Sequence, residues 1–139
     1  MAKIRKAQAG LAGLTAALVM ALTAGASAQT GNAEAAKLKN PVKVTPASIA
    51  AGQVAYGKYC KFCHGVDAKG NGPLAPKGTM PPSLIDAEWA KGSTDGEIFT
   101  NIKDGIGPKF DMKPMTAKMM DADIWNTVNY LRDLAKKTK

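Results

Sequence analysis

The pattern of apolar and polar positions is clearest near the C-terminal end of the chain. Ile124, Val128, Leu131 and Ala135 recur at the spacing of one helix face, so a helix is predicted from about residue 121 onward. The charges at its two ends suit the helix dipole: Asp121 and Asp123 at the start, and Lys136, Lys137 and Lys139 at the end.

A second helix is predicted to begin at Thr45-Pro46. Threonine is a good N-cap, and proline fits the first helical position. Ile49 and Tyr56 follow at helical spacing, and the helix runs into Cys60.

Two further short helices are expected. Residues 94–97 read Thr-Asp-Gly-Glu, a capping box that predicts a helix ending at Gly105. The stretch 83–90 is expected to form the other. Glycine and proline fill 65–82 and predict a long loop. No strand is expected, so the fold class is all-α.

The first 28 residues have the layout of a secretory signal peptide. A basic stretch at 3–6 precedes an apolar run at 11–23, and Ala26-Ser27-Ala28 matches a small-residue cleavage site. Cleavage is predicted after about Ala28, which places the mature protein outside the cytoplasm. An uncleaved membrane anchor is the alternative, but the apolar run is short for a membrane span.

Composition leaves room for a single domain beyond the signal peptide. The chain has 139 residues and a formal charge of +8, which falls to about +5 without the signal peptide. Polar, small and basic residues fill 29–44, which is expected to be a flexible lead-in to a domain at 45–139. The lysines lack interleaved aromatic residues, so nucleic-acid binding is not expected.

Two thiols and an imidazole lie within five residues at Cys60-Lys61-Phe62-Cys63-His64. The spacing C-x-x-C-H is typical of covalent haem attachment. Each thiol can add to one vinyl group of the macrocycle, and the histidine is then delivered to the iron as an axial ligand. The predicted cofactor is one haem c with its iron, bound through Cys60, Cys63 and His64.

Three other interpretations of this motif fit less well. A zinc site usually needs four ligands, whereas the chain has two cysteines and one histidine. A thioredoxin-like pair needs a βαβ setting that the pattern around Cys60 lacks. A disulfide across two residues would be strained and would not require the neighbouring histidine.

Composition limits the second axial ligand. His64 is the only histidine, so two histidines of this chain cannot bind one iron. Methionine is the other usual ligand of an electron-carrier haem, and it raises the reduction potential. The candidates beyond the signal peptide are Met80, Met112, Met115, Met119 and Met120.

Three sequence blocks resemble the bacterial class I monohaem c-type cytochromes. They are Gly52-x-x-x-Tyr56-x-x-x-Cys60-x-x-Cys63-His64-Gly65, Gly70-Asn71-Gly72-Pro73 and Trp125-x-x-x-x-Tyr130-Leu131-Arg132. The resemblance covers about 45–135. It implies a cytochrome c fold, with three to five helices around one covalently bound haem. It also implies that the first and last helices cross, with Gly52 meeting Tyr130 or Trp125.

The resemblance further implies how the haem is held. A carbonyl in the loop 72–74 would accept the Nδ1 proton of His64, and this bond would fix the orientation of the ring. Pro73 and Leu74 would belong to the haem pocket.

Family order places the methionine ligand in the loop before the last helix, which favours Met112. Lys113 separates Met112 from Pro114, where the family often has a Met-Pro pair, so Met115 is the runner-up. Met80 matches a family loop that lines the pocket.

These features predict a periplasmic one-electron carrier rather than an enzyme. With both axial positions filled, the iron has no open site for a small-molecule substrate. Redox proteins with acidic docking surfaces are the expected partners, because lysines flank the haem-binding segments. The alternatives are a dedicated electron-accepting subunit of a periplasmic dehydrogenase and a haem gas sensor. Membrane association is expected only if the signal peptide is uncleaved.

Overall fold

The computed structural model describes residues 31–78, 80–107 and 111–138, so the predicted signal peptide lies outside the described residues. The elements are the 3-10 helix η1 (Ala35–Lys37) and the α-helices α1 (Pro46–Tyr59), α2 (Lys61–His64), α3 (Asp95–Asp104) and α4 (Asp121–Lys137). The described residues contain no strand, and the expected all-α fold is confirmed. Within these three ranges, no helix is both long and apolar enough to cross a membrane.

The helix ends follow the capping signals of the sequence. Thr45 accepts a hydrogen bond from the Ser48 N–H at 3.1 Å, and Pro46 opens α1. Thr94 and Glu97 bond reciprocally at the start of α3, which ends at Gly105. The helices predicted from 45, 94 and 121 are therefore confirmed.

The segment 83–90 is not helical, and the expectation of a helix there is wrong. The Ser83 hydroxyl bonds the Asp86 carboxylate at 2.9 Å, and the Trp89 indole N–H donates to the Asp86 carbonyl at 3.0 Å. The Trp89 backbone N–H donates to the Ser93 hydroxyl at 2.7 Å. Because these local side-chain bonds compete with helical ones, the segment forms an irregular turn.

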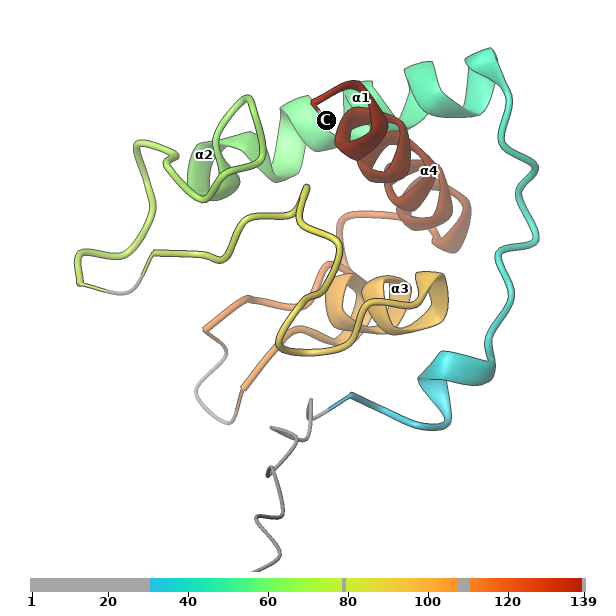
Figure 1. The fold of residues 1–139 in the computed structure, drawn as a ribbon, viewed down its shortest axis with the longest axis horizontal. Coiled ribbons are helices and arrows are strands. Elements are labelled where there is room, and N and C mark those ends of the chain that lie inside the picture. The colour runs from blue at the N-terminus through green and yellow to red at the C-terminus, as the bar shows by residue number, and fades with distance from the viewer. Residues whose placement is uncertain (1–30, 79, 108–110, 139) are drawn as a thin grey trace, which may run out of the picture.

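Helices α1 and α4 cross at close quarters, and α4 lies between α1 and α3 (Figure 1). Gly52 makes the crossing possible, because a Cβ there would collide with the Asn126 carbonyl and lie 2.8 Å from Tyr130 Cβ. The predicted contact of Gly52 with Tyr130 is thus confirmed. Trp125 instead stacks on Phe99 of α3, with ring centroids 4.1 Å apart.

The lead-in was expected to be flexible and irregular, but its described part packs on α3 and α4. Ala35 of η1 is buried, and its carbonyl lies against Gly96 at the start of α3. Asn129 of α4 is 1% exposed, and its amide accepts from Asn40 at 2.8 Å and donates to the Val42 carbonyl at 3.2 Å. A buried polar side chain with satisfied bonds fixes this segment, which has no apolar period of its own.

Candidate functional site

The end of α1 and the single turn of α2 carry the three residues of the C-x-x-C-H motif. Cys60 closes α1 and opens α2, and it is buried with 8% of its surface exposed. The N–H groups of Cys63 and His64 both bond to the Cys60 carbonyl, at 3.2 Å and 3.0 Å. Cys63 and His64 are half-buried. The structure therefore brings both thiols and the imidazole together on one turn.

The loop after this turn folds back onto it, and residues 60–74 are here called the attachment segment. The carbonyl of Phe62 accepts from the Leu74 N–H at 2.7 Å, and that of Cys63 accepts from the Gly72 N–H at 3.1 Å. The carbonyl of His64 accepts from the Gly70 N–H at 2.8 Å. These carbonyls belong to the C-terminal end of α2, where the helix itself offers no partners.

Gly72 permits the loop to approach this closely. A Cβ at Gly72 would collide with the Phe62 carbonyl oxygen and lie 2.6 Å from the Cys63 carbonyl carbon. Any larger residue would push the loop away from α2 and break the bonds that satisfy its last carbonyls.

The fourth carbonyl in the row, that of Gly65, accepts from the Tyr56 hydroxyl at 2.7 Å. Tyr56 lies one turn before Cys60 on α1, is 3% exposed and packs its ring at a tilt on Tyr130. Burial raises the pKa of this phenol, which therefore remains a donor at working pH. The sequence identified Tyr56 as a helix-face residue and as part of the block that resembles c-type cytochromes, but spacing carries no signal for its hydroxyl bond.

Burial also sets the protonation of the motif. It raises the pKa of the Cys60 thiol to about 12, with a smaller contribution from Cys63, and it lowers the pKa of His64. At neutral pH, His64 is therefore the neutral imidazole that a metal ion requires. The two cysteines form no disulfide with each other, so both sulfurs are available to the vinyl groups of a haem. Two thiols and a neutral imidazole on one turn are the donor set that a covalently attached haem needs.

The expected partner of His64 Nδ1 is not observed. This atom is buried and has no hydrogen-bond partner among the described residues. The Leu74 carbonyl instead lies 3.5 Å from the Cys63 Sγ. Leu74 is exposed, and Pro73 lines a surface depression of about 330 Å³ beside Lys61 and Phe62.

The loop from Gly105 to Met115, here called the methionine segment, carries both leading candidates for the second ligand. Ile106 and Met112 form an isolated antiparallel bridge, with N–H to O distances of 2.9 Å and 3.4 Å. The Met115 N–H bonds to the carbonyls of Ile102 and Lys103 at the end of α3. Met112 and Met115 are both half-buried and pack against the hydrophobic core.

The other three methionines differ in their surroundings. Met119 is buried in the core with 5% exposed, whereas Met80 and Met120 are 64% and 72% exposed. An axial ligand must be enclosed with the iron, which favours Met112 and Met115 over the two exposed residues.

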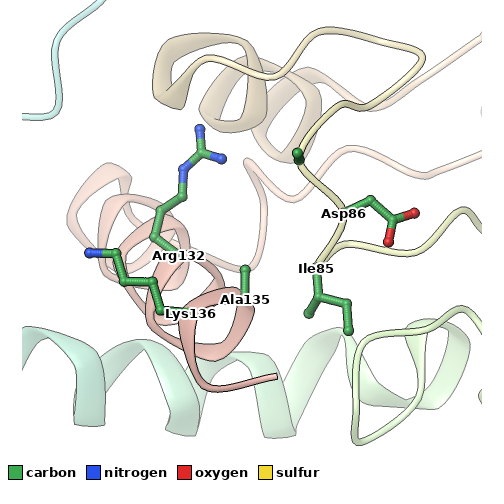
Figure 2. Close-up of a pocket in the computed structure, with 6 residues that line it drawn as sticks. Ile85, Asp86, Arg132, Ala135 and Lys136 are labelled. Atoms are coloured by element: carbon green, nitrogen blue, oxygen red, sulfur yellow. The ribbon is translucent and has the colours of Figure 1, made fainter. Parts of the chain in front are cut away.

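A second, shallow depression of about 170 Å³ lies where α4 meets the irregular turn after the long loop (Figure 2). Arg132 extends from it toward the start of α3, where it bonds the Asp95 carboxylate at 2.8 Å and also the Ser93 carbonyl. Arg132 therefore ties α4 to α3, a role that its place in the terminal sequence block did not reveal. Lys136 projects from the next turn of α4.

A helical fold with crossing terminal helices and a C-x-x-C-H turn between them defines a class I c-type cytochrome domain. The chain belongs to the family described as cytochrome c oxidase, cbb3-type, subunit III, whose model matches residues 47–131.

Known proteins support this assignment. The chain is 35% identical over 74 residues to the cbb3-type cytochrome c oxidase subunit CcoP of Rhodobacter capsulatus, and the match covers 53% of this chain. It spans only 23% of the length of that relative.

Two solved structures share the fold. A chain of the reducing HAO-like protein complex of Kuenenia stuttgartiensis matches with a TM-score of 0.59 and 22% identity, over 71% of this chain and 48% of that one. Cytochrome cL of Methylophaga aminisulfidivorans matches with a TM-score of 0.53 and 23% identity, over 69% and 57% of the two chains.

These findings confirm the predicted cofactor and the general function. The domain is a haem-based electron-transfer cytochrome with covalently attached haem c and its iron.

Proposed function

We propose that this chain is a periplasmic one-electron carrier whose haem iron is bound by His64 and Met112. Cys60 and Cys63 would form the two thioether bonds. When bound, the haem supplies a single Fe(III)/Fe(II) couple. The observation that carries the proposal is the attachment segment, where both thiols and the only histidine of the chain share one turn with fixed carbonyls.

The methionine segment supports the second ligand. Met112 is half-buried against the core, and its backbone is paired with Ile106. Met115, the runner-up, is likewise half-buried but bonds to the end of α3. The protein would contribute a dry pocket, and a methionine ligand would raise the reduction potential.

The signal-peptide pattern at the start of the sequence supports the periplasmic location. Residues 1–28 would be the signal peptide and 45–139 the cytochrome domain. The described part of the lead-in packs on that domain, so the folded unit would begin before residue 45. A mass spectrum of the exported protein tests this division, since cleavage after Ala28 would leave Gln29 as the first residue.

The surface of the attachment segment supports docking to acidic redox proteins. Phe62, Val66 and Leu74 are exposed apolar side chains, and the Lys61 ammonium lies 5.3 Å from the centre of the Phe62 ring. An apolar patch with a basic rim would attract a partner with an acidic rim, and the encounter rate would fall as salt is added. Pro73, beside Phe62, would belong to both this surface and the haem pocket.

The first test is an absorption spectrum of the exported protein, with Met112→Ala and Met115→Ala as matched variants. The oxidised wild type should show the weak long-wavelength band expected of an iron–methionine bond, and Met112→Ala alone should abolish it. Loss of the band only in Met115→Ala would move the ligand to Met115. A wild type without the band, whose reduced form binds CO readily at neutral pH, would contradict the carrier and indicate a gas sensor.

One observation favours a second candidate, a dedicated subunit of a larger redox enzyme. The relative in Rhodobacter capsulatus is named as an oxidase subunit, and a structural neighbour belongs to a protein complex. Gel filtration of the native protein distinguishes the two. A carrier should elute as a small protein, whereas a subunit should remain with its partner at physiological salt.

A further inference from the structure

Within the part of the chain that the structure describes, Tyr56 is the only residue whose side chain donates to one of the four successive carbonyls after Lys61. The carbonyls of Phe62, Cys63 and His64 accept from backbone N–H groups of the returning loop. The Gly65 carbonyl instead accepts from the Tyr56 hydroxyl at 2.7 Å. This bond joins α1 directly to the residue that follows the histidine.

The backbone offers the Gly65 carbonyl only a weak substitute. The Ala68 N–H lies 3.4 Å from that oxygen, beyond the usual range for a strong N–H···O bond. Without the hydroxyl, the carbonyl would lose its short partner. A buried acceptor left without a partner destabilises the folded state unless the chain rearranges.

The backbone at Gly65 can change conformation easily unless a hydrogen bond holds it in place. Gly65 has a φ of +81°, a region where glycine is free to move among several conformations. His64 ends α2 and Gly65 is the C-cap of that helix, so a change in the backbone of Gly65 would move the imidazole. Gly70 fixes the His64 carbonyl, and Tyr56 fixes the next one.

We propose that Tyr56 is a positioning residue for His64. Its hydroxyl holds the Gly65 carbonyl, and this fixes the direction in which the backbone leaves His64 and thereby the plane of the imidazole. The inference rests on the proposed ligation of the haem iron by His64. It assigns a role in tuning the haem to a residue that otherwise belongs to the packing of α1 on α4.

The test compares Tyr56→Phe with Tyr130→Phe in the haem-loaded protein. Both variants keep the ring and remove one hydroxyl from the same tilted pair of rings, which lie 5.4 Å apart. Electron paramagnetic resonance of the oxidised form reports the orientation of the axial ligands, and a redox titration reports the midpoint potential. Urea unfolding of both variants measures their stability separately.

We expect Tyr56→Phe to retain the haem, to change the resonance signals and to lower the midpoint potential beyond the scatter of repeat titrations. The potential should fall because a looser turn lets water approach the ligand and stabilise the oxidised iron. Tyr130→Phe should leave both readouts at their wild-type values.

Two results would overturn the inference while leaving the proposed function intact. One is a Tyr56→Phe protein that is less stable but has wild-type resonance signals and midpoint potential. This result would show that the hydrogen bond contributes to stability alone. The other is an equal shift in both variants. If the resonance spectrum of the wild type shows no histidine ligand on the iron, both the proposed function and this inference are contradicted.

Discussion

The segments that carry the two proposed ligands are fixed by different means. In the attachment segment, three loop N–H groups and one buried hydroxyl satisfy four successive carbonyls. In the methionine segment, an isolated bridge pairs Ile106 with Met112, and one of its two bonds is long at 3.4 Å. Beyond that bridge, the Met115 N–H bonds the end of α3.

Among the residues that the structure describes in each segment, this difference predicts which of the two segments opens first. Local opening is easiest where few buried contacts and few backbone bonds hold a segment. The attachment segment also adjoins the crossing of α1 and α4, whereas the methionine segment follows the shorter α3. If Met112 binds the iron as proposed, we expect it to dissociate more readily than His64.

The largest loss of stability should come from disrupting the crossing of α1 and α4, which supports the attachment segment. Gly52→Ala would drive a methyl group into the Asn126 backbone, and overpacking of this kind should lower the free energy of unfolding by about 3 kcal/mol. Urea unfolding of the haem-loaded protein measures the change.

Gly57→Ala on the same helix is the matched control. A Cβ there would meet nothing within 4 Å, so the substitution should raise the free energy of unfolding by about 0.5–1 kcal/mol through helix propensity. Equal destabilisation by both variants would show that the crossing does not depend on Gly52.

A smaller and more selective effect is expected in the methionine segment. Gly105 has a φ of +80°, and a Cβ there would lie 2.6 Å from the Met112 carbonyl oxygen. Gly105→Ala should therefore displace Met112, weaken the long-wavelength band and destabilise the protein by about 1–3 kcal/mol. Haem attachment should be unchanged, as judged by the mass of the protein.

Gly78→Ala separates backbone strain from the displacement of Met112. Gly78 has a similar φ of +86°, but a Cβ there would meet nothing within 4 Å. Gly78→Ala should lose part of the stability that Gly105→Ala loses, but it should keep the long-wavelength band. If it weakens the band as much as Gly105→Ala does, contact with the Met112 carbonyl is not the cause.

Much of this fold was predictable because its signals are local. Thr45-Pro46 and the capping box at 94–97 fix two helix starts through bonds within one turn. The docking of the lead-in was not predictable, because it depends on Asn129, which lies far along the chain and gives no pattern of its own. The segment 83–90 was mispredicted because its apolar residues serve an irregular turn.

The candidate site likewise has a part that the sequence predicted and a part that needed the structure. The spacing of Cys60, Cys63 and His64 predicted a shared turn, because covalent haem attachment constrains neighbours in sequence. The choice between Met112 and Met115 depends on which sulfur reaches the iron, and both are half-buried against the same core. The bond from Tyr56 to Gly65 needed the structure, since it joins a helix to a turn nine residues later.

The smallest effect should appear in acid, through the cap of the helix that leads into the methionine segment. The backbone N–H of Thr94 donates to Glu97 at 3.0 Å and is the main cause of a lowered pKa for this carboxyl. A carboxyl whose pKa is lower in the folded state stabilises it fully above the unfolded pKa of about 4.3 and loses this contribution as the pH falls through the folded value. Glu97→Gln should thus cost about 1 kcal/mol at pH 7 and progressively less below pH 4.

Urea unfolding of wild type and Glu97→Gln across this pH range measures the difference, and the long-wavelength band reports the methionine segment separately. In the wild type, the band should weaken on acidification before the protein unfolds, because α3 loses its cap while the attachment segment keeps its backbone bonds. Asp104→Asn, at the other end of α3, removes one carboxylate without touching this cap and should keep the wild-type profile. A constant difference between wild type and Glu97→Gln at all pH values would mean that the cap acts through shape rather than charge. In that case acid would not distinguish the two sides of the haem.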